Sequence, residues 1–349
     1  MASNPPSFDG IPEENIIRVT SYHRRDLDHA VLLIEHKQIL GSIRQPSRDP
    51  LASLGPLQVL PAELLHEVCF LLDIQSLFRF RQVSRGTRNV VSSIRAYQKT
   101  AEHAPHTLRA ILHTKIASWF TIRDLFQVLH TRDCSCCGAF GGFIFLPTFL
   151  RCCFWCVKEG KMPAVVSLDD VSYDNRWKSP DFLNSIPNLL DSIPTVRAKH
   201  GFYERCQIGA RARRIVTMDD FIRLSEPWIG KKAARKAPFK ELEFLPLMAT
   251  TTLPHLDLAS GKIQNVVSCS GCRLRLEQAP KESTEEIDAR TLSEKCYSHD
   301  EFIAHFRQCH EAQKVWSLSR TDVDIAAKKS DFVRQGGYYP PRPIMRKTY

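Results

Sequence analysis

The clearest pattern of apolar and polar residues lies between residues 60 and 94. It opens with Leu60-Pro61, and aliphatic residues then recur at 64, 65, 68, 71 and 72, offsets typical of one stripe of an α-helix. Proline suits the first helical position, and Glu63 suits a helix N-terminus. A second apolar set predicts another short helix, and Ser84 can cap a third. We expect three short helices with an apolar stripe that must be buried against other helices or a partner chain. The stripe and its continuation comprise Leu60, Pro61, Leu64, Leu65, Val68, Leu71, Leu77, Phe80 and Val83.

Later segments predict more helices and few strands. Helices are expected to begin at Pro105, at Thr121 with Asp124 as its capping-box partner, and at Thr217. The apolar run at 141–146 predicts a strand. The predicted fold class is mainly α (α+β), with an irregular C-terminal half.

Four cysteines predict a first metal site, because Cys134 with Cys137 and Cys153 with Cys156 form two C-x2-C pairs fifteen residues apart. Two such pairs can present four thiolates tetrahedrally to one zinc ion, which would be structural because no coordination position stays open. Buried cysteines without a metal are the alternative. Cys136 and Cys152 are left over as core thiols or as ligands in a shifted register.

A second cluster combines Cys269 and Cys272 with His305 and Cys309, which we expect four residues apart on one helix that begins near Asp300. His310 could replace Cys309, and Cys296 is a reserve ligand or a plain thiol. The alternative is a surface histidine beside core cysteines. The charged segment 277–295 between the halves is expected to be a loop. One or two structural zinc ions are therefore predicted.

Catalytic motifs are missing. The sequence contains no G-x-S-x-G elbow, no phosphate-binding P-loop and no H-E-x-x-H, and the first cluster is too small for the two interleaved zinc sites of a RING domain. We expect a chain without enzyme activity of its own.

The segment LPAELLHEVCFLLDIQSLFRFRQVSR resembles an F-box, with the LP pair, both leucine clusters and Val83-Ser84-Arg85 at the spacing of that family. Gly86-Thr87 departs from it, since the family more often carries a large aromatic residue nearby. The resemblance implies docking on a Skp-type adaptor and, through it, on the cullin of a ubiquitin ligase. Residues 58–160, with FGGF-x-FLPT and RCC, also resemble a large set of fungal F-box proteins.

The charge balance leaves a second function open. The net charge is +10, with basic clusters at 211–214 and 231–236. A zinc-containing nucleic-acid-binding regulator is therefore the alternative, although solvated basic faces are commoner and regular aromatic interleaving is missing. A scaffold acting outside a ligase is a third possibility.

Targeting signals are also missing. The N-terminus lacks a secretory pattern, and no run of apolar residues is long enough to span a membrane. Twelve cysteines then favour a reducing compartment, the cytoplasm and/or the nucleus.

The expected function is a substrate receptor whose C-terminal part recruits a protein. The expected divisions are a tail and linker at 1–50, the F-box at 51–98, helices with the Cys-rich module at 99–160, a middle region at 161–260, a second Cys/His module at 261–320 and a disordered tail at 321–349.

Overall fold

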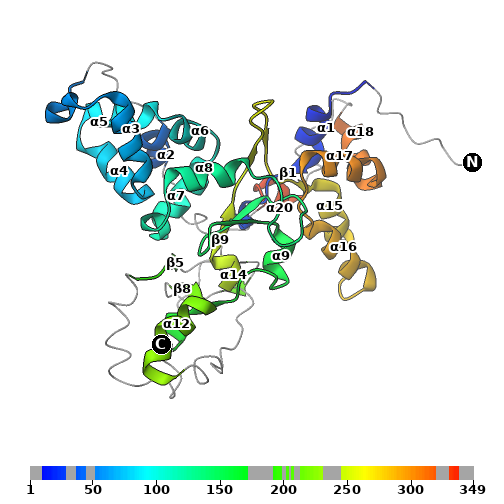
Figure 1. Ribbon diagram of the computed structural model, residues 1–349. Coiled ribbons are helices and arrows are strands. Elements are labelled where there is room, and N and C mark those ends of the chain that lie inside the picture. The colour runs from blue at the N-terminus through cyan, green and yellow to red at the C-terminus, as the bar shows by residue number, and fades with distance from the viewer. Residues whose placement is uncertain are drawn as a thin grey trace, which may run out of the picture. The chain divides into compact units, whose positions relative to one another are not determined.

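The computed structural model describes residues 10–28, 37–44, 52–171, 192–198, 202–203, 206–207, 213–230, 245–319 and 330–337. The chain folds into two units (Figure 1). One unit comprises Leu27–Ile263, and the other joins Met1–Asp26 to Gln264–Tyr349. Helices dominate and the sheets are small, which confirms the predicted mainly α class.

Short capped helices form the first part of unit Leu27–Ile263. As predicted, Ser84 caps the third helix of the 60–94 segment, and Thr87 completes the capping box. Gly86 is buried because the backbone at Ser53 crosses it so closely that a Cβ would collide with the Ser53 carbonyl. The departure from the F-box pattern at Gly86-Thr87 therefore has a local cause. Gly86 leaves room for the backbone at Ser53, and Thr87 completes the helix cap. The helices of this segment, with the preceding turn, are η3 (Gly55–Val59), α3 (Ala62–Leu71), α4 (Ile74–Val83) and α5 (Arg85–Ser93).

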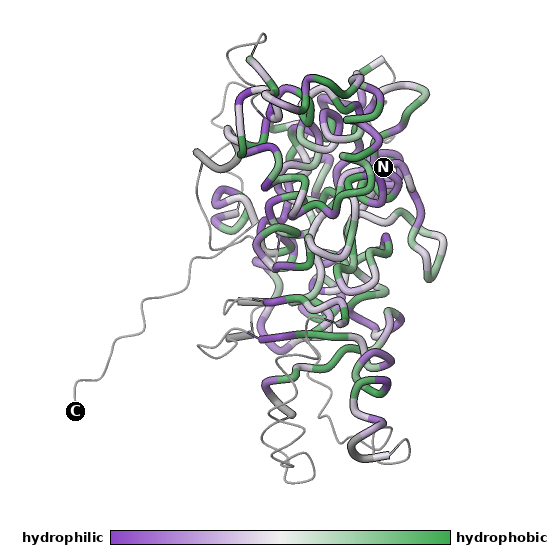
Figure 2. The backbone as a smooth tube through the Cα atoms, turned by 60° about the vertical axis from the view of Figure 1, so that its left-hand side comes forward, coloured by the Kyte–Doolittle hydropathy of each residue, from purple (hydrophilic) through white to green (hydrophobic). Residues whose placement is uncertain are grey.

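The following helices pack on this group and share its core. The buried Tyr97 ring lies beside Phe78, and its hydroxyl donates to the Ile43 carbonyl at 2.7 Å, which ties α2 to the group. The starts at Pro105 and at Thr121 are confirmed, the latter with its capping box to Asp124. Apolar and polar stretches alternate along the helical parts of the tube in Figure 2, as amphipathic helices require. These helices are α2 (Lys37–Arg44), α6 (Arg95–His103), α7 (Pro105–His113), η4 (Ile116–Ser118) and α8 (Ile122–His130).

A three-stranded antiparallel sheet follows, in the order β3-β2-β9. The predicted strand at 141–146 is its central strand, with Phe143 opposite Cys152 on one side and Thr252 on the other. Thr107 donates to the Thr252 carbonyl at 2.8 Å, which joins this sheet to α7. The strands and the neighbouring helices are β2 (Phe143–Phe145), β3 (Leu150–Cys152), α9 (Phe154–Lys158), α14 (Leu245–Met248), β9 (Thr250–Thr252) and β10 (His255–Leu256).

The middle region contains a second antiparallel sheet in the order β4-β8-β5. Thr217 caps the helix after β8, as predicted, and Asp219 and Asp220 occupy its first turn. The Arg214 guanidinium pairs with Asp169 at 2.7 and 3.0 Å. The elements are β4 (Val165–Ser167), α10 (Leu168–Val171), β5 (Val196–Ala198), β6 (Phe202–Tyr203), β7 (Cys206–Gln207), β8 (Arg213–Thr217) and α12 (Met218–Ile229).

The other unit closes the N-terminal segment onto the C-terminal helices. Ser21 pairs with Cys269 between strands β1 and β12, and Ile16 packs in one core with Phe302, Phe306 and Trp316. Its elements are α1 (Glu13–Thr20), β1 (Ser21–Tyr22), β12 (Ser268–Cys269), α15 (Ser270–Gln278), α16 (Thr284–Glu294), α17 (His299–Gln308), α18 (His310–Ser319) and α20 (Asp331–Arg334). Along the chain the units meet in η1 (Arg25–Leu27) and β11 (Ile263–Gln264).

Three expectations differ from the structure. Segment 277–295 was predicted to be a loop, but it contains helix α16, because Ser283 caps the helix and Glu285 and Glu286 occupy its first turn. Residues 10–28, which the sequence placed in a tail, carry α1 and β1. Residues 330–337, which lie in the segment expected to be a disordered tail, carry α20, because Ser330 caps the helix and Phe332 and Val333 are buried. The SIP repeat up to Asp191, the basic cluster 231–236 and the tail beyond Gly337 lie outside the described residues. No helix in the described parts of the chain is long and apolar enough to cross a membrane.

Candidate docking face and metal-ligand clusters

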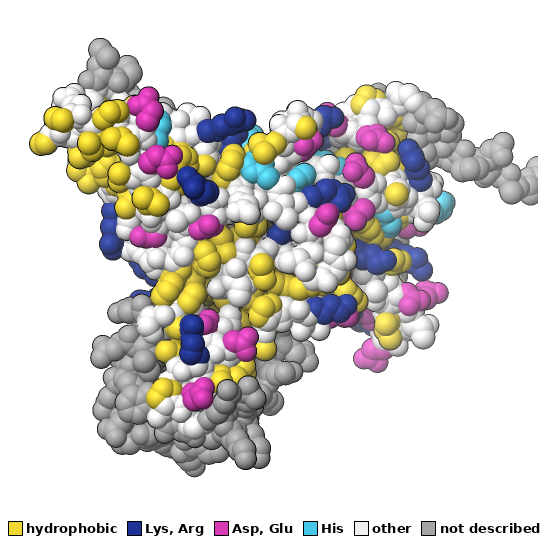
Figure 3. Space-filling view, in the orientation of Figure 1, with side chains coloured by type: hydrophobic (Ala, Val, Ile, Leu, Met, Phe, Trp, Pro, Cys, Tyr) yellow, Lys and Arg dark blue, Asp and Glu magenta, His cyan; other side chains and the backbone are white. Residues whose placement is uncertain are grey.

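An apolar face covers the first helices of the 60–94 segment. Six of the eleven large hydrophobic side chains that are exposed in the described residues lie between 59 and 83. Hydrophobic side chains gather in Figure 3 over the region where Figure 1 places α3, α4 and α5. We call this set the docking face; it comprises Val59, Leu60, Leu64, Val68, Leu71 and Val83.

Helix α3 divides its apolar stripe into two lines. Leu65 and Cys69, four residues apart, are buried. Leu64 and Val68, also four apart, are 53% and 49% exposed, and Leu71 in the next turn is 81% exposed. The helix therefore packs into the core through Leu65 and Cys69, and its second line of apolar side chains is exposed to solvent.

The remaining predicted adaptor-binding residues are distributed between these two environments. Leu77 is buried and Phe80 is half-buried, whereas Pro61 is exposed. Leu65 and Leu77 therefore shape the core of the segment. Val59, which is 86% exposed, was not named from the sequence, although its position directly before Leu60-Pro61 is a signal that could have revealed it.

The first predicted ligand set comes together. The four sulfur atoms of Cys134, Cys137, Cys153 and Cys156 lie within 4.8 Å of one another, and those of Cys137 and Cys153 are 3.7 Å apart. Gly138, with φ +72°, allows the tight turn after the first pair, since this backbone conformation is strained for other residues. Cys153 caps α9, so that its sulfur accepts from the Cys156 N–H at 3.3 Å.

The two leftover cysteines of this region are not in the group. Cys152 is fully buried in β3, and Cys136 is exposed, with its sulfur 3.5 Å from that of Met162. Of the registers that the sequence left open, the structure brings together Cys134, Cys137, Cys153 and Cys156.

The thiols of the first cluster differ in acidity. Burial acts to raise the pKa of Cys134, but neighbouring backbone N–H groups bond its sulfur and lower the pKa to about 7. Burial raises the pKa of Cys153 to about 11. At neutral pH the cluster would therefore hold protons that a bound cation must displace.

Arg151, which the sequence analysis did not single out, anchors this region. Its side chain is buried, and its guanidinium donates to the carbonyls of Val128 at 3.1 Å, Leu253 at 3.2 Å and Pro254 at 2.6 Å, with further bonds to Gly141 and Leu129. Its own carbonyl accepts from the N–H and hydroxyl of Ser135 between the first two cysteines. The side chain thus links α8 to the strand region after β9, and the backbone carbonyl of the same residue holds the first Cys pair.

The second predicted ligand set also comes together. The ligand atoms of Cys269, Cys272, His305 and Cys309 lie within 4.8 Å of one another. The Cys309 sulfur is 3.9 Å from that of Cys269 and 3.8 Å from that of Cys272. The Nε2 atom of His305 is 3.3 Å from the Cys272 sulfur.

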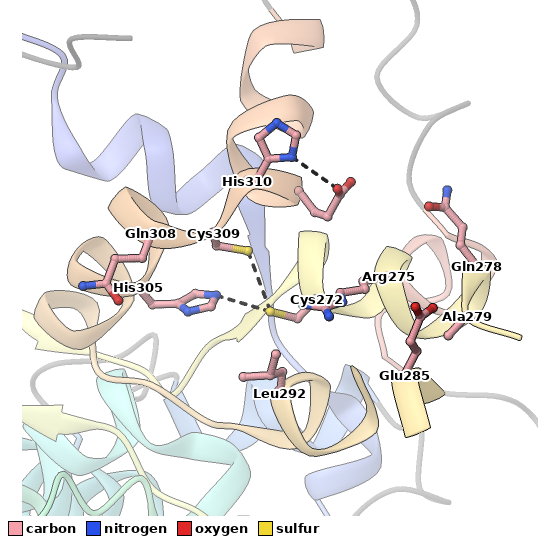
Figure 4. Close-up of a pocket in the computed structure, with 11 residues that line it drawn as sticks. Cys272, Arg275, Gln278, Ala279, Glu285, Leu292, His305, Gln308, Cys309 and His310 are labelled. Atoms are coloured by element: carbon pink, nitrogen blue, oxygen red, sulfur yellow. Dashed lines mark hydrogen bonds and ion pairs between the residues drawn. The ribbon is translucent and has the colours of Figure 1, made fainter. Parts of the chain in front are cut away.

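The local structure around Cys309 differs from the expected single helix. Helix α17 ends at Gln308, and Cys309 has extended backbone angles before α18 begins. This break turns the Cys309 sulfur toward Cys272, whereas His310 points away and contacts Glu311 at 3.5 Å (Figure 4). The alternatives His310 and Cys296 are not in the group.

Tyr297 positions the histidine of this cluster. Its ring stacks on that of His305, with centroids 4.7 Å apart, and its hydroxyl lies 3.4 Å from His305 Nδ1. A proton on Nδ1 that is held by the tyrosine leaves the Nε2 lone pair free for a metal. Hydrogen bonds from the Cys269 and Cys272 thiols lower the pKa of Cys309. The two clusters can each hold a metal ion.

Comparison with known proteins adds one finding to this geometry. Residues 57–99 match the family model of the F-box domain. The chain contains an F-box domain. No curated protein and no solved structure matches the chain. F-box domains in general bind Skp-type adaptors and belong to non-catalytic subunits that recognise substrates of ubiquitin ligases. The likeness of residues 58–160 to fungal F-box proteins stays a prediction.

Proposed function

We propose that the chain is a substrate-receptor subunit of a Skp-cullin-F-box ubiquitin ligase, non-catalytic in itself. Residues 60–94 would dock on the Skp-type adaptor, and the C-terminal part of the chain would recruit a protein for ubiquitin transfer by other subunits. The compartment we propose is the cytoplasm and/or the nucleus, because the described cysteines form no disulfide with one another.

The docking face is the observation that carries this proposal. Burying one exposed Leu or Val side chain in a partner contributes about 1.5–3 kcal/mol before the cost of association. Six such side chains between residues 59 and 83 therefore supply a sizeable driving force for binding. An F-box whose own core is already built from Leu65, Cys69 and Leu77 has no internal use for them.

We further propose that both clusters hold structural zinc. With Zn–S bonds of about 2.3 Å, sulfurs at the corners of a tetrahedron lie about 3.8 Å apart. The sulfur pairs at 3.7, 3.8 and 3.9 Å match this spacing. Four thiolates, or three with an imidazole, also suit zinc better than a hard cation, and neither set leaves a position for substrate. Purified protein should hold close to two equivalents of zinc, and a protein without zinc would contradict both sites.

Capture by a recombinant Skp-type adaptor tests the docking proposal. The variant Leu64→Asp with Val68→Asp places two charges on the docking face and should abolish capture, because both carboxylates would be buried unpaired. Ile287→Asp is the matched control, since Ile287 is 63% exposed on α16, outside the F-box, and should leave capture unchanged. Failure of the wild type to bind, or capture of the double variant, would refute the docking role.

The same preparation can separate a ligase subunit from a scaffold acting outside a ligase. Co-purification of a cullin with the chain and the adaptor is expected for a receptor. Nucleic-acid binding gains no support from the described residues of the first basic cluster, because Arg214 is already paired with Asp169.

A further inference from the structure

A pocket of about 570 Å³ lies beside the second cluster. Its walls come from helices α15, α16, α17 and α18, and three members of the cluster, Cys272, His305 and Cys309, form part of them (Figure 4). This volume is within the range of about 300–1,000 Å³ that is usual for ligand sites. It can accept a few residues of a peptide.

Most charged side chains on these helices are already paired. Arg273 bonds Glu277 at 2.8 Å, Arg290 bonds Glu286 at 2.5 Å, and Lys314 bonds Glu311 at 2.9 Å. The pairing neutralises Glu311, which is itself a lining residue of the pocket.

Two charged lining residues differ from this pattern. The Arg275 guanidinium and the Glu285 carboxylate have no ion pair or hydrogen bond to any residue in the described part of the chain. The lining amides of Gln278 and Gln308 have none either. Among the described residues, the pocket therefore has one cation, one anion and two amides without a partner.

The metal proposed for the cluster decides the balance of charge. Three thiolates around a divalent ion leave one net negative charge at the pocket wall. Together with Glu285 this outweighs Arg275, so a basic group should be attracted more strongly than an acidic one. Free amides on two walls suit the backbone N–H and C=O groups of an extended peptide.

We propose that this pocket binds a short segment of a recruited protein, in which a basic side chain meets Glu285 and an acidic side chain meets Arg275. This inference rests on the proposed receptor function and names its recognition site. Both side chains are exposed to solvent, as a reversible recruitment site requires.

The test is a positional-scanning peptide array, probed with the purified full chain. The wild type should select a basic residue at one position and an acidic residue at a neighbouring one. Glu285→Lys should reverse the first preference and Arg275→Glu the second, each weakening the wild-type peptides about fivefold, as expected of an exposed ion pair. Lys281→Glu, a charge reversal in the α15–α16 loop outside the pocket, should leave the selection unchanged.

The outcomes separate this inference from the receptor proposal. No selection by the wild type, or the same selection by both pocket variants, overturns the pocket assignment. The zinc content of each variant shows whether its second cluster is intact. Because the F-box lies in the other unit, all these variants should still be captured by the Skp-type adaptor. Loss of adaptor capture by the wild type would instead overturn the receptor function.

Discussion

Gly271 provides a sharp test of how the second cluster is built. It lies between the proposed ligands Cys269 and Cys272 in the first turn of α15. A Cβ atom at this position would overlap the backbone of Glu311 and Ala312 at the start of α18. Backbone cannot rotate aside as a flexible side chain does, so Gly271→Ala must push α15 away from α18.

The expected magnitude follows from two opposing effects. Alanine is better than glycine inside a helix by about 0.5–1 kcal/mol, whereas overpacking a close contact costs about 1–3 kcal/mol or more. Because the overlap is with backbone, we expect the upper part of that range and a net loss of about 2 kcal/mol. Gly41 in α2 is the matched control, since a Cβ there meets nothing within 4 Å, and Gly41→Ala should stabilise its helix by about 0.5–1 kcal/mol.

Hydrogen–deuterium exchange can measure both effects locally, in peptides from α15 and from α2. Gly271→Ala should speed exchange in α15 and weaken zinc binding at the second cluster in competition with a chelator. Gly41→Ala should slow exchange in α2. If hydrogen–deuterium exchange in α15 is as slow in Gly271→Ala as in the wild type, the close packing of α15 on α18 does not determine the geometry of the second cluster.

Three further predictions concern other residues. Tyr297→Phe keeps the stacked ring but loses the hydroxyl at His305 Nδ1, so zinc affinity at the second cluster should fall at least about tenfold, measured by chelator competition, with the first cluster unchanged as the internal reference. Arg151→Met leaves several backbone carbonyls without donors and should destabilise the unit that contains it by about 3 kcal/mol or more in urea titrations; a loss below about 1 kcal/mol would contradict the anchoring role. Burial lowers the pKa of His130 and His255, so the unfolded chain binds these protons more tightly, and stability should fall as the pH drops below about 6.5, the usual histidine value; His255→Gln should reduce that fall, and an equal fall would exclude His255 as a source.

Local signals in the sequence predicted much of the fold and of the site. Caps at Ser84, Thr121 and Thr217 depend only on neighbouring residues, and all three begin helices where expected. The two C-x2-C pairs of the first cluster are local in the same sense, because each pair is one tight turn. The F-box start also follows from a short run of residues, and the family match at 57–99 includes it.

Contacts between distant segments were not predictable in this way. Strand β9 completes a sheet with β2 about a hundred residues earlier, and Ser21 pairs with Cys269. Neither pairing leaves a local pattern, since each depends on where the rest of the chain places two short segments that are far apart in sequence. The buried position of Arg151 has the same origin, because its partners are backbone carbonyls that any sequence offers.

The division of α3 is the clearest limit of periodicity. Offsets of 0, 1, 4, 7 and 8 mark an apolar stripe but do not say which edge of it faces the core. The structure shows Leu65 inward and Leu64 outward, one residue apart. Only the packing of α5 and its neighbours decides this, and it turns a predicted core stripe into a candidate binding surface.

Calorimetric titration of a Skp-type adaptor into the full chain tests the central claim most directly. We predict a single site for the wild type and, for Leu64→Asp with Val68→Asp, a loss of affinity of about a hundredfold or more, as expected when central apolar contacts of an interface are replaced by buried charges. Ile287→Asp should bind like the wild type. Equal affinity of the double variant and the wild type would show that the docking face on α3 is not the adaptor-binding surface.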